Sequence, residues 1–528
     1  MTEIHGTPFK SWLMTTDHKK IGIMYLWTAF IFFAFAGIAA LVMRAELGAP
    51  GKTFIDPALY YMLFSFHGTT MIFLWIIPVL VAGFGNFLIP LLIGAPDMAY
   101  PRLNGLSYWV YLAGGILLYI GFYTGLGDAT KGAAAVGWTG YPPLSGVVGS
   151  PGHGVDFYVL GIHCLGVSSM MGAINFMVTI LRMRKPGITF HNMSLFVWAQ
   201  FTTAILIVFA TPFIGTAMML NFFDRNFATS FFTASGDPEL YQHIFWFYSH
   251  PAVYVMILPA FGIISEVLPR MVRRPIFGYK AMAYSILAIA FLGFTVWAHH
   301  MFTTTLPYQA RLGFMIMTMI IGVPTGVKFF NWIFTMYGGH MRFEAPLLFC
   351  VGFISMFLIG GIDGVFMASI PVDYQLHDTY WPVSHLHYVL FGGSVLGVFA
   401  GMYYWWPRFT GRMYNRSLAK WHFWLTMIGL NLVFMTMHFL GTAGMPRRVY
   451  DYQPAYATLN LIATIGAFTV ALGQLPFLIN IFWSRSTGMR VHGDPWNDRP
   501  AIEWRGFKAL PGGPVMAPEA KKWGGGKL

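Results

Sequence analysis

The chain has 528 residues, of which 56% are hydrophobic and 18% aromatic, while only 10% carry a charge. Soluble globular domains carry about 25% charged residues, so this composition excludes a soluble globular protein and indicates an integral membrane protein. The net charge of +12 would suit a nucleic-acid partner, but no such partner is expected, because the basic residues are distributed as a membrane topology signal.

Apolar runs long enough to cross a bilayer follow one another along the chain. A helix of about 20 apolar residues spans the hydrocarbon core, and the runs predict an all-α integral membrane protein, a bundle of about twelve transmembrane helices surrounded by lipid. The predicted spans are residues 22–43, 60–93, 106–126, 156–183, 193–220, 240–268, 281–306, 310–337, 346–370, 380–407, 421–440 and 456–484. Residues 1–484 are predicted to form one core and residues 485–528, rich in Gly, Pro and Lys, a cytoplasmic tail.

Lysine and arginine residues are shared unevenly between the two sides of the predicted bundle. With a cytoplasmic N-terminus, sixteen lie before the first span or in even-numbered turns and seven in the opposite turns. This asymmetry follows the positive-inside rule and predicts that both termini are cytoplasmic, with the bacterial inner membrane as the expected location. Cys164 and Cys350 lie in different apolar segments, so no disulfide framework is expected.

Histidines at membrane depth are the most informative residues of these spans. Polar side chains there are costly and are candidates for function, and neutral imidazole binds both iron and copper. Six of the 17 histidines lie well inside predicted spans: His67, His250, His299, His300, His385 and His387. His163 and His438 also lie in spans, where interhelical hydrogen bonds are expected. The acid Asp363 lies within the ninth span, where it either carries protons or bonds a neighbouring helix.

The spacing of four histidines predicts where metals would lie. His385 and His387 are two residues apart and point to nearly opposite faces of a helix, so that one helix can hold two metal centres. His299 and His300 are adjacent, and both reach one metal only if it lies between their directions or the helix is locally distorted.

Two further side chains complete the chemistry around this pair. His250 would supply a third ligand, and Tyr254, four residues later on the same helical face, would place a phenol beside the metal. Lys328 lies in the middle of the eighth predicted span, where a lysine is costly and is a candidate for moving protons or ions.

Short motifs in a fixed order resemble subunit I of haem-copper cytochrome c oxidase over nearly the whole chain. They are Phe66-His67-Gly68, Gly83-Phe84-Gly85-Asn86, Trp297-Ala298-His299-His300-Met301, Val323-Pro324-Thr325-Gly326-Val327-Lys328, His377-Asp378-Thr379-Tyr380, His385-Leu386-His387 and Gly444-Met445-Pro446-Arg447-Arg448. The resemblance implies a respiratory enzyme that reduces O₂ to water with electrons from cytochrome c and pumps protons.

The resemblance implies two haems, of the haem A type, and one copper. His67 and His387 would be the axial ligands of a low-spin haem, which relays electrons, and His385 the axial ligand of a high-spin haem, whose open position binds oxygen. His250 would bind the copper together with the adjacent histidine pair and would be covalently linked to Tyr254.

At the predicted outer surface the resemblance implies a second group of ligands. Arg447 and Arg448 would neutralise the haem propionates. His377 and Asp378 would bind magnesium or manganese, at a site completed by another subunit, and Asp373 would belong to the same polar cluster. No paired-cysteine loop for a dinuclear copper centre is present, so this electron-accepting centre is expected on a partner, subunit II.

Two proton routes are implied. Lys328 and Thr325 would form one toward the catalytic tyrosine. The other would begin at Asp97, with Asn86 and Asn104 beside it and Ser168 and Ser169 further in.

The second route departs from the commonest family pattern. Where most members read Gly-His-Pro-Glu-Val-Tyr, this chain has Tyr248 and Ser249 directly before His250, and the usual glutamate is missing. The Tyr-Ser pair resembles a subgroup in which a tyrosine hydroxyl replaces that carboxyl, so Tyr248 and Ser249 are expected to relay protons.

Three alternatives remain. A quinol oxidase of the same superfamily is disfavoured by Asp378, because the quinol branch tends to have asparagine after this histidine. A nitric oxide reductase would bind non-haem iron, generally without Tyr254 and Lys328. A twelve-helix secondary transporter matches the span count but needs neither paired histidines nor a metal.

Overall fold

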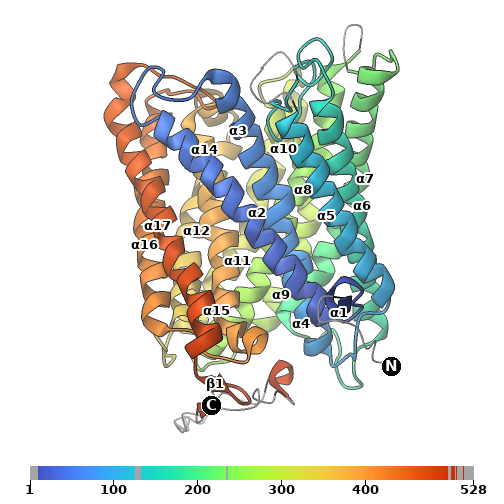
Figure 1. Cartoon of the computed structure of the whole chain (residues 1–528), viewed down its shortest axis with the longest axis vertical. Helices are drawn as coiled ribbons and strands as arrows, with labels where there is room; N and C mark the ends of the chain where they lie inside the picture. The colour runs from blue at the N-terminus through green and yellow to red at the C-terminus, as the bar shows by residue number, and fades with distance from the viewer. Residues whose placement is uncertain are drawn as a thin grey trace.

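The chain folds into long helices that stand side by side. Its computed structural model describes residues 10–124, 132–232, 236–496, 501–505, 507 and 515–516. Within these residues, eleven helices are long and apolar enough to cross a membrane, and the shorter apolar helix α9 lies among them. This agrees with the predicted bundle of about twelve spans. The short helix α1 (Lys10–Leu13) and strand β1 (Arg490–Val491) lie at the same end of the bundle (Figure 1).

The membrane-spanning segments follow one another in chain order. They are α2 (His18–Glu46), the run α3 (Pro57–Thr69), η1 (Thr70–Ile76), η2 (Pro78–Gly83) and α4 (Phe84–Ile93), then α5 (Pro101–Tyr123), α6 (Gly154–Arg182), α7 (Leu195–Asn226), α8 (Pro238–Met271), α9 (Tyr279–Gly293), α10 (Tyr308–Ile320) with α11 (Gly322–Met336), α12 (Ala345–Ala368), α14 (Tyr380–Val389) with η5 (Leu390–Val395) and α15 (Leu396–Thr410), α16 (Arg416–Thr442) and α17 (Ala457–Thr487).

Short elements complete the fold. They are the 3₁₀ helices η4 (Trp297–Met301), η6 (Pro454–Tyr456) and η7 (Ile502–Trp504), the helix α13 (Ile370–Leu376), and the strand β2 (Val515–Met516), which pairs in parallel with β1.

Polar residues fix the beginnings of several spans. The carboxylates of Asp17, Asp56 and Asp237 accept hydrogen bonds from backbone N–H groups in the first turns of α2, α3 and α8, which satisfies donors that the helix itself leaves unpaired. Gly94 and Gly411 end α4 and α15 in the left-handed conformation, with φ of 71° at both residues, as expected of C-terminal glycines.

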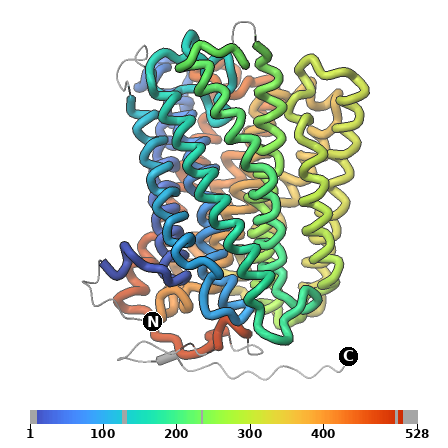
Figure 2. The backbone as a smooth tube through the Cα atoms, turned by 90° about the vertical axis from the view of Figure 1, so that its right-hand side faces the viewer, coloured from blue at the N-terminus to red at the C-terminus, as the bar shows by residue number. Residues whose placement is uncertain are grey.

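The second and sixth spans form the centre of the bundle. In Pro57–Ile93 and Pro238–Met271, 89% and 83% of the most apolar stretch is buried, against 17% in Tyr308–Met336. Figure 2 shows α10 and α11, in yellow-green to yellow, along one edge of the bundle. Central spans are therefore shielded from lipid, and two of the candidate ligands, His67 and His250, lie on them.

The predicted helix over residues 281–306 is wrong after Gly293. There α9 ends in tight turns, in which the N–H groups of Phe294 and Thr295 donate to carbonyls three residues back. A Cβ at Gly293 would lie 2.8 Å from Cδ2 of Tyr254, so the phenol ring packs where the helix stops. The following residues re-form as the 3₁₀ helix η4, which carries His299 and His300.

Wider π-helical turns interrupt two of the spans that carry candidate ligands. η1 begins three residues after His67, and η5 begins three residues after His387. Such turns occur frequently at functional sites. In η5, glycines allow a close approach of α12, because a Cβ at Gly392 would lie 2.7 Å from Cβ of Met356.

Candidate metal centre

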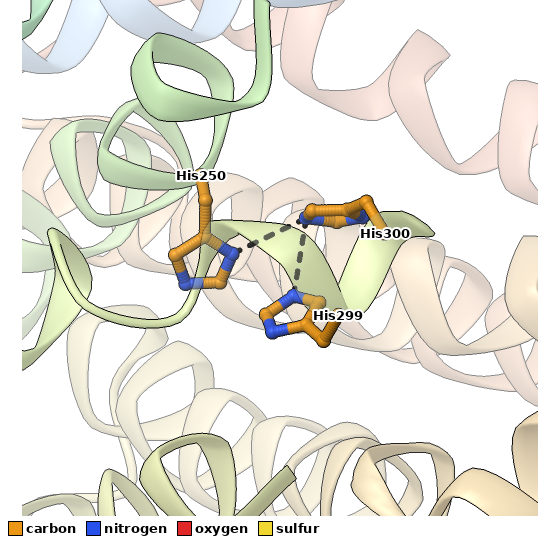
Figure 3. A group of neighbouring side chains, drawn as sticks. All are labelled: His250, His299 and His300. Carbon is orange, nitrogen blue, oxygen red and sulfur yellow. Dashed lines mark hydrogen bonds between the residues drawn. The ribbon is translucent and has the colours of Figure 1, made fainter. Parts of the chain in front are cut away.

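His250, His299 and His300 turn their rings toward one point inside the bundle (Figure 3). Nε2 of His300 lies 3.2 Å from Nδ1 of His250 and 3.1 Å from Nε2 of His299. Imidazole nitrogens bind metals at about 2.0–2.1 Å, which places the nitrogens of a three-ligand site about 3.3–3.6 Å apart. The cluster therefore fits one metal ion with three imidazole ligands.

The 3₁₀ turn explains how adjacent histidines share this site. The ring centroids of His299 and His300 are 4.3 Å apart. Trp246 stacks on His300 at a centroid distance of 3.7 Å, and the hydroxyl of Thr318 lies 3.0 Å from Nδ1 of His299. Partners of this kind fix the orientation of metal-binding rings. Neither Trp246 nor Thr318 was predicted, because both contacts join different helices.

Tyr254 lies against the same cluster. Its hydroxyl is 2.8 Å from Nε2 of His250, one helical turn away on α8. Because Nε2 faces the phenol, Nδ1 of His250 is the nitrogen that faces the other two histidines. The predicted shared face of the two residues is present in the structure.

His67 and His387 form a second pair. Their ring centroids are 6.4 Å apart and their planes differ by 12°. Nδ1 of each ring lies within hydrogen-bond distance of a backbone carbonyl, at 2.9 Å for His67 and Ala36 and at 2.7 Å for His387 and Val383, which leaves Nε2 for a metal. Two imidazoles bound at about 2.0 Å on opposite sides of one ion have centroids about 6.3 Å apart, so the pair fits bis-histidine ligation.

His385 stands on the other side of α14. Its Nδ1 lies 2.9 Å from the carbonyl oxygen of Gly360 on α12, so Nε2 is again left for a metal. A Cβ at Gly364 would lie 3.1 Å from Cε1 of His385, so the absence of a side chain at this glycine leaves room for the ring. The ring of His385 lies against α12, whereas His387 lies parallel to His67, so the two ligands of α14 serve different sites.

A polar cluster lies just before α14. Nδ1 of His377 is 3.6 Å from Asp373, and Nε2 is 3.3 Å from Asp378. Asp373 and Asp378 raise the pKa of His377 to about 9, while His377 and Arg447 lower the pKa of Asp378. The oxygen and nitrogen donors suit a hard divalent cation.

The predicted arginine pair lies beside this cluster. Nε of Arg447 donates to Asp378 at 2.7 Å, and the backbone N–H of Arg447 donates to the carbonyl of the same residue. Arg448 follows with a positive φ of 62°. The structure therefore brings Arg447 to the acidic cluster and places Arg448 next to it.

Lys328 is fully buried on α11. Its Nζ donates to the carbonyl of Met282 at 3.0 Å and lies 5.6 Å from the ring centre of Phe261. The hydroxyl of Thr325, three residues before Lys328, donates to the backbone carbonyl of Ile321. The sequence predicted a functional lysine within this span, and the structure buries its ammonium group beside a backbone carbonyl.

Polar atoms also mark the predicted second route. Burial raises the pKa of Asp97, which lies just after α4. Asn86 and Asn104 are each 1% exposed, yet Oδ1 of Asn86 and both amide atoms of Asn104 make no hydrogen bond within the described part of the chain. Buried polar groups of this kind are satisfied by water, so the two amides fit a hydrated path.

Further along, three hydroxyls meet. The hydroxyl of Tyr25 lies 3.1 Å from Oγ of Ser107 and 3.4 Å from Oγ of Ser168. Ser168 was expected there, but Tyr25 and Ser107 were missed, because a tyrosine in an apolar span is indistinguishable from a packing residue. Ser249 is buried on α8, and its hydroxyl makes no hydrogen bond with any described residue; Tyr248 precedes it.

Of the hydrogen bonds expected between helices, the described part of the chain shows one and lacks another. His438 on α16 and Asp363 on α12 lie 2.7 Å apart and are both buried, so that expectation is confirmed. Nδ1 of His163 makes no hydrogen bond with any described residue.

Comparison with known proteins identifies the family. Residues 20–469 match the family model described as "Cytochrome C and Quinol oxidase polypeptide I". The chain belongs to the haem-copper oxidase subunit I family. It is 50% identical to cytochrome c oxidase subunit 1 of Synechocystis sp. over 491 residues, 93% of this chain and 87% of the relative. It is 44% identical to quinol oxidase subunit 1 of Bacillus subtilis, over 95% and 77% of the two chains.

A solved structure has the same fold. It is the cryo-EM structure of a heme-copper terminal oxidase dimer, with a TM-score of 0.79 at 19% identity, covering 92% of this chain and 88% of that one. This likeness, with the family match, identifies the chain as a multi-pass membrane oxidoreductase of the haem-copper oxidases, proteins whose cofactors are haem and copper.

Proposed function

We propose that the chain is the catalytic subunit of a respiratory terminal oxidase that reduces O₂ to water with electrons from cytochrome c and couples this reaction to proton pumping. One observation carries the proposal: three imidazoles and a phenol meet at one point, and two further histidine rings lie parallel at the spacing of bis-histidine ligation. A secondary transporter needs neither arrangement.

The donor sets divide the cofactors between two sites. His67 and His387 would hold a low-spin haem and His385 a high-spin haem, both of the haem A type, while the copper would take Nδ1 of His250 and the Nε2 atoms of the histidines on η4. When bound, these groups supply the electron storage and the oxygen binding that the reaction needs.

The chain's own residues then handle protons and geometry. Nδ1–H donation to backbone carbonyls holds the rings of His67, His385 and His387 in one tautomer. The Tyr254 hydroxyl holds a proton 2.8 Å from His250, and a covalent link between these two residues, as in the family, is part of the proposal.

Lys328 would deliver protons toward Tyr254, with Thr325 on the same route. This role is supported by full burial of the ammonium group, which donates to the backbone carbonyl of Met282, because a titratable side chain at membrane depth is costly and marks a candidate proton path. Ser265 on α8 accepts a hydrogen bond at 3.1 Å from Trp332, which lies one turn after Lys328 on α11.

The second route would begin at Asp97, pass Asn86 and Asn104, and end at Tyr248 and Ser249. Support comes from the unsatisfied amide and hydroxyl atoms along it. A tyrosine hydroxyl can hold and pass a proton, so Tyr248 would take the place of the missing glutamate.

At the outer side, His377 and Asp378 would bind magnesium or manganese, with Asp373 in the same cluster, and Arg447 and Arg448 would neutralise haem propionates. The mutual contacts of Asp378 with His377 and Arg447 support this grouping.

The partners would be a subunit II with a dinuclear copper centre, cytochrome c and O₂. The bacterial inner membrane is the proposed location, with both termini cytoplasmic. α1 and β1 lie at one end of the bundle (Figure 1), which agrees with termini on one side. Quinol is the second candidate donor, since one relative at 44% identity is a quinol oxidase subunit.

Two measurements test the proposal on the purified complex. Pyridine haemochrome analysis with metal quantification should give two haems and one copper per chain. Oxygen consumption should then proceed with reduced cytochrome c and not with a quinol alone. A colourless preparation would contradict the assignment as an oxidase. Activity with a quinol alone would show that quinol, and not cytochrome c, is the electron donor.

A further inference from the structure

Asp363 and His438 form a buried contact that the proposed proton routes and ligand sets leave unused. Oδ2 of Asp363 lies 2.7 Å from Nε2 of His438, and the two side chains are 8% and 7% exposed. They come from α12 and α16, which both pack against α14. A carboxylate is costly to bury and persists in a dry interior when it is paired.

The pair packs against α14, the helix that carries the proposed haem ligands His385 and His387. The ring of Tyr388 lies parallel to His438 at a centroid distance of 5.5 Å, and Trp381 lies edge-on to it at 4.7 Å. Both aromatic residues belong to α14. The contact between α12 and α16 therefore packs against α14 through Tyr388 and Trp381.

The same turn of α12 touches the ring of His385. Gly360, whose carbonyl lies 2.9 Å from Nδ1 of His385, is three residues before Asp363, and Gly364, which lies against Cε1 of His385, is the next residue. Asp363 therefore lies within the same helical turn of α12 that packs against the ring of His385.

Charge behind a metal-bound imidazole changes the electronic properties of the metal. A hydrogen bond from Nδ1–H makes the imidazole a stronger donor, and a nearby carboxylate increases this effect, which stabilises the oxidised metal. The low local dielectric inside the bundle makes the effect larger than in water.

We propose that Asp363, held by His438, is a positioning residue that places a negative charge behind His385 and so lowers the reduction potential of the metal bound there. This inference rests on the proposed role of His385 as the ligand of the high-spin haem.

The test uses three variants of the purified oxidase complex. Asp363→Asn and Asp363→Thr remove the charge with different shapes, and Asp363→Glu keeps it. We expect the two neutral variants to shift the midpoint potential of the high-spin haem upward and the iron–histidine stretching band of the reduced enzyme to lower frequency. Asp363→Glu should return both toward the parent values, and the low-spin haem should change less.

Asp156→Asn is the matched control, because Asp156 is a buried carboxylate paired with Arg225 at 2.7 Å, far along the chain from the haem ligands. Unchanged potential and band in an assembled neutral variant would overturn the inference. Loss of haem from all three Asp363 variants would also overturn it, because the pair would then serve packing alone. The proposed function fails separately, if the parent enzyme shows no high-spin haem signal.

Discussion

The hydroxyl of Tyr254 and Nε2 of His250 lie 2.8 Å apart across one turn of α8. This contact assigns one ring nitrogen of His250 to the phenol and the other to the three-histidine cluster. The phenol is therefore part of the candidate centre, although it is not needed to hold the metal.

Tyr254→Phe should separate these two roles. We expect oxygen consumption to fall by about 100-fold or more, since a positioned acid–base group contributes about 10²–10⁴-fold, while the copper content stays near one per chain. Tyr284→Phe, at an exposed position on α9, is the control. An oxygen electrode and metal analysis make the measurement, and full activity without the hydroxyl would refute the assignment.

Lys328→Met tests the proton route in α11. Methionine fills the space of the lysine stem but carries no proton, so turnover should fall by about 100-fold or more while both haem signals persist. Lys280→Met, an exposed lysine at the beginning of α9, should behave like the parent. Normal oxygen consumption by Lys328→Met would remove Lys328 from the route.

Helical periodicity was sufficient for the parts of the site that lie within one helix. The two-residue spacing of His385 and His387 predicts two faces, and the structure places the rings toward different neighbours. The four-residue spacing of His250 and Tyr254 predicts one face, where their contact lies. In such cases both partners share one backbone geometry, which the sequence specifies.

Contacts between distant helices were not accessible in this way. Trp246 on His300, and Tyr25 with Ser168, join residues 54 and 143 positions apart, and no spacing rule relates such residues. The end of α9 at Gly293 depends on packing against Tyr254, which is a tertiary contact. The sequence also left open how adjacent histidines share one metal, and the 3₁₀ turn η4 answers that question.

Tyr248→Phe tests the substitute relay before His250. Loss of the hydroxyl should reduce the number of protons translocated per electron, or turnover itself, because phenylalanine can neither hold nor pass a proton. Ser249→Ala, at the neighbouring unpartnered hydroxyl, should add to the defect if both residues serve one route. Proton release by reconstituted vesicles is the measurement, and full translocation by the double variant would reject the relay.

Glu503 should make the stability of the packed segment η7 (Ile502–Trp504) depend on pH. It is 4% exposed in η7, and burial together with the neighbouring Glu266 raises its pKa from 4.5 to about 7. Because the folded-state pKa exceeds the unfolded one, the stabilisation is complete below the unfolded value and is lost as pH rises through about 7. From pH 5 to pH 8 the loss should be roughly 2–3 kcal/mol.

Glu503→Gln should abolish this dependence, because glutamine stays neutral throughout. We expect the amides of Ile502–Trp504 to exchange hydrogen faster as pH rises in the parent, after correction for intrinsic rates, and at a constant corrected rate in the variant. Glu344→Gln, whose side chain pairs with Arg416 at 3.4 Å, should keep the parental slope. An identical slope in Glu503→Gln would show that another group titrates, since the only change is the loss of this carboxyl.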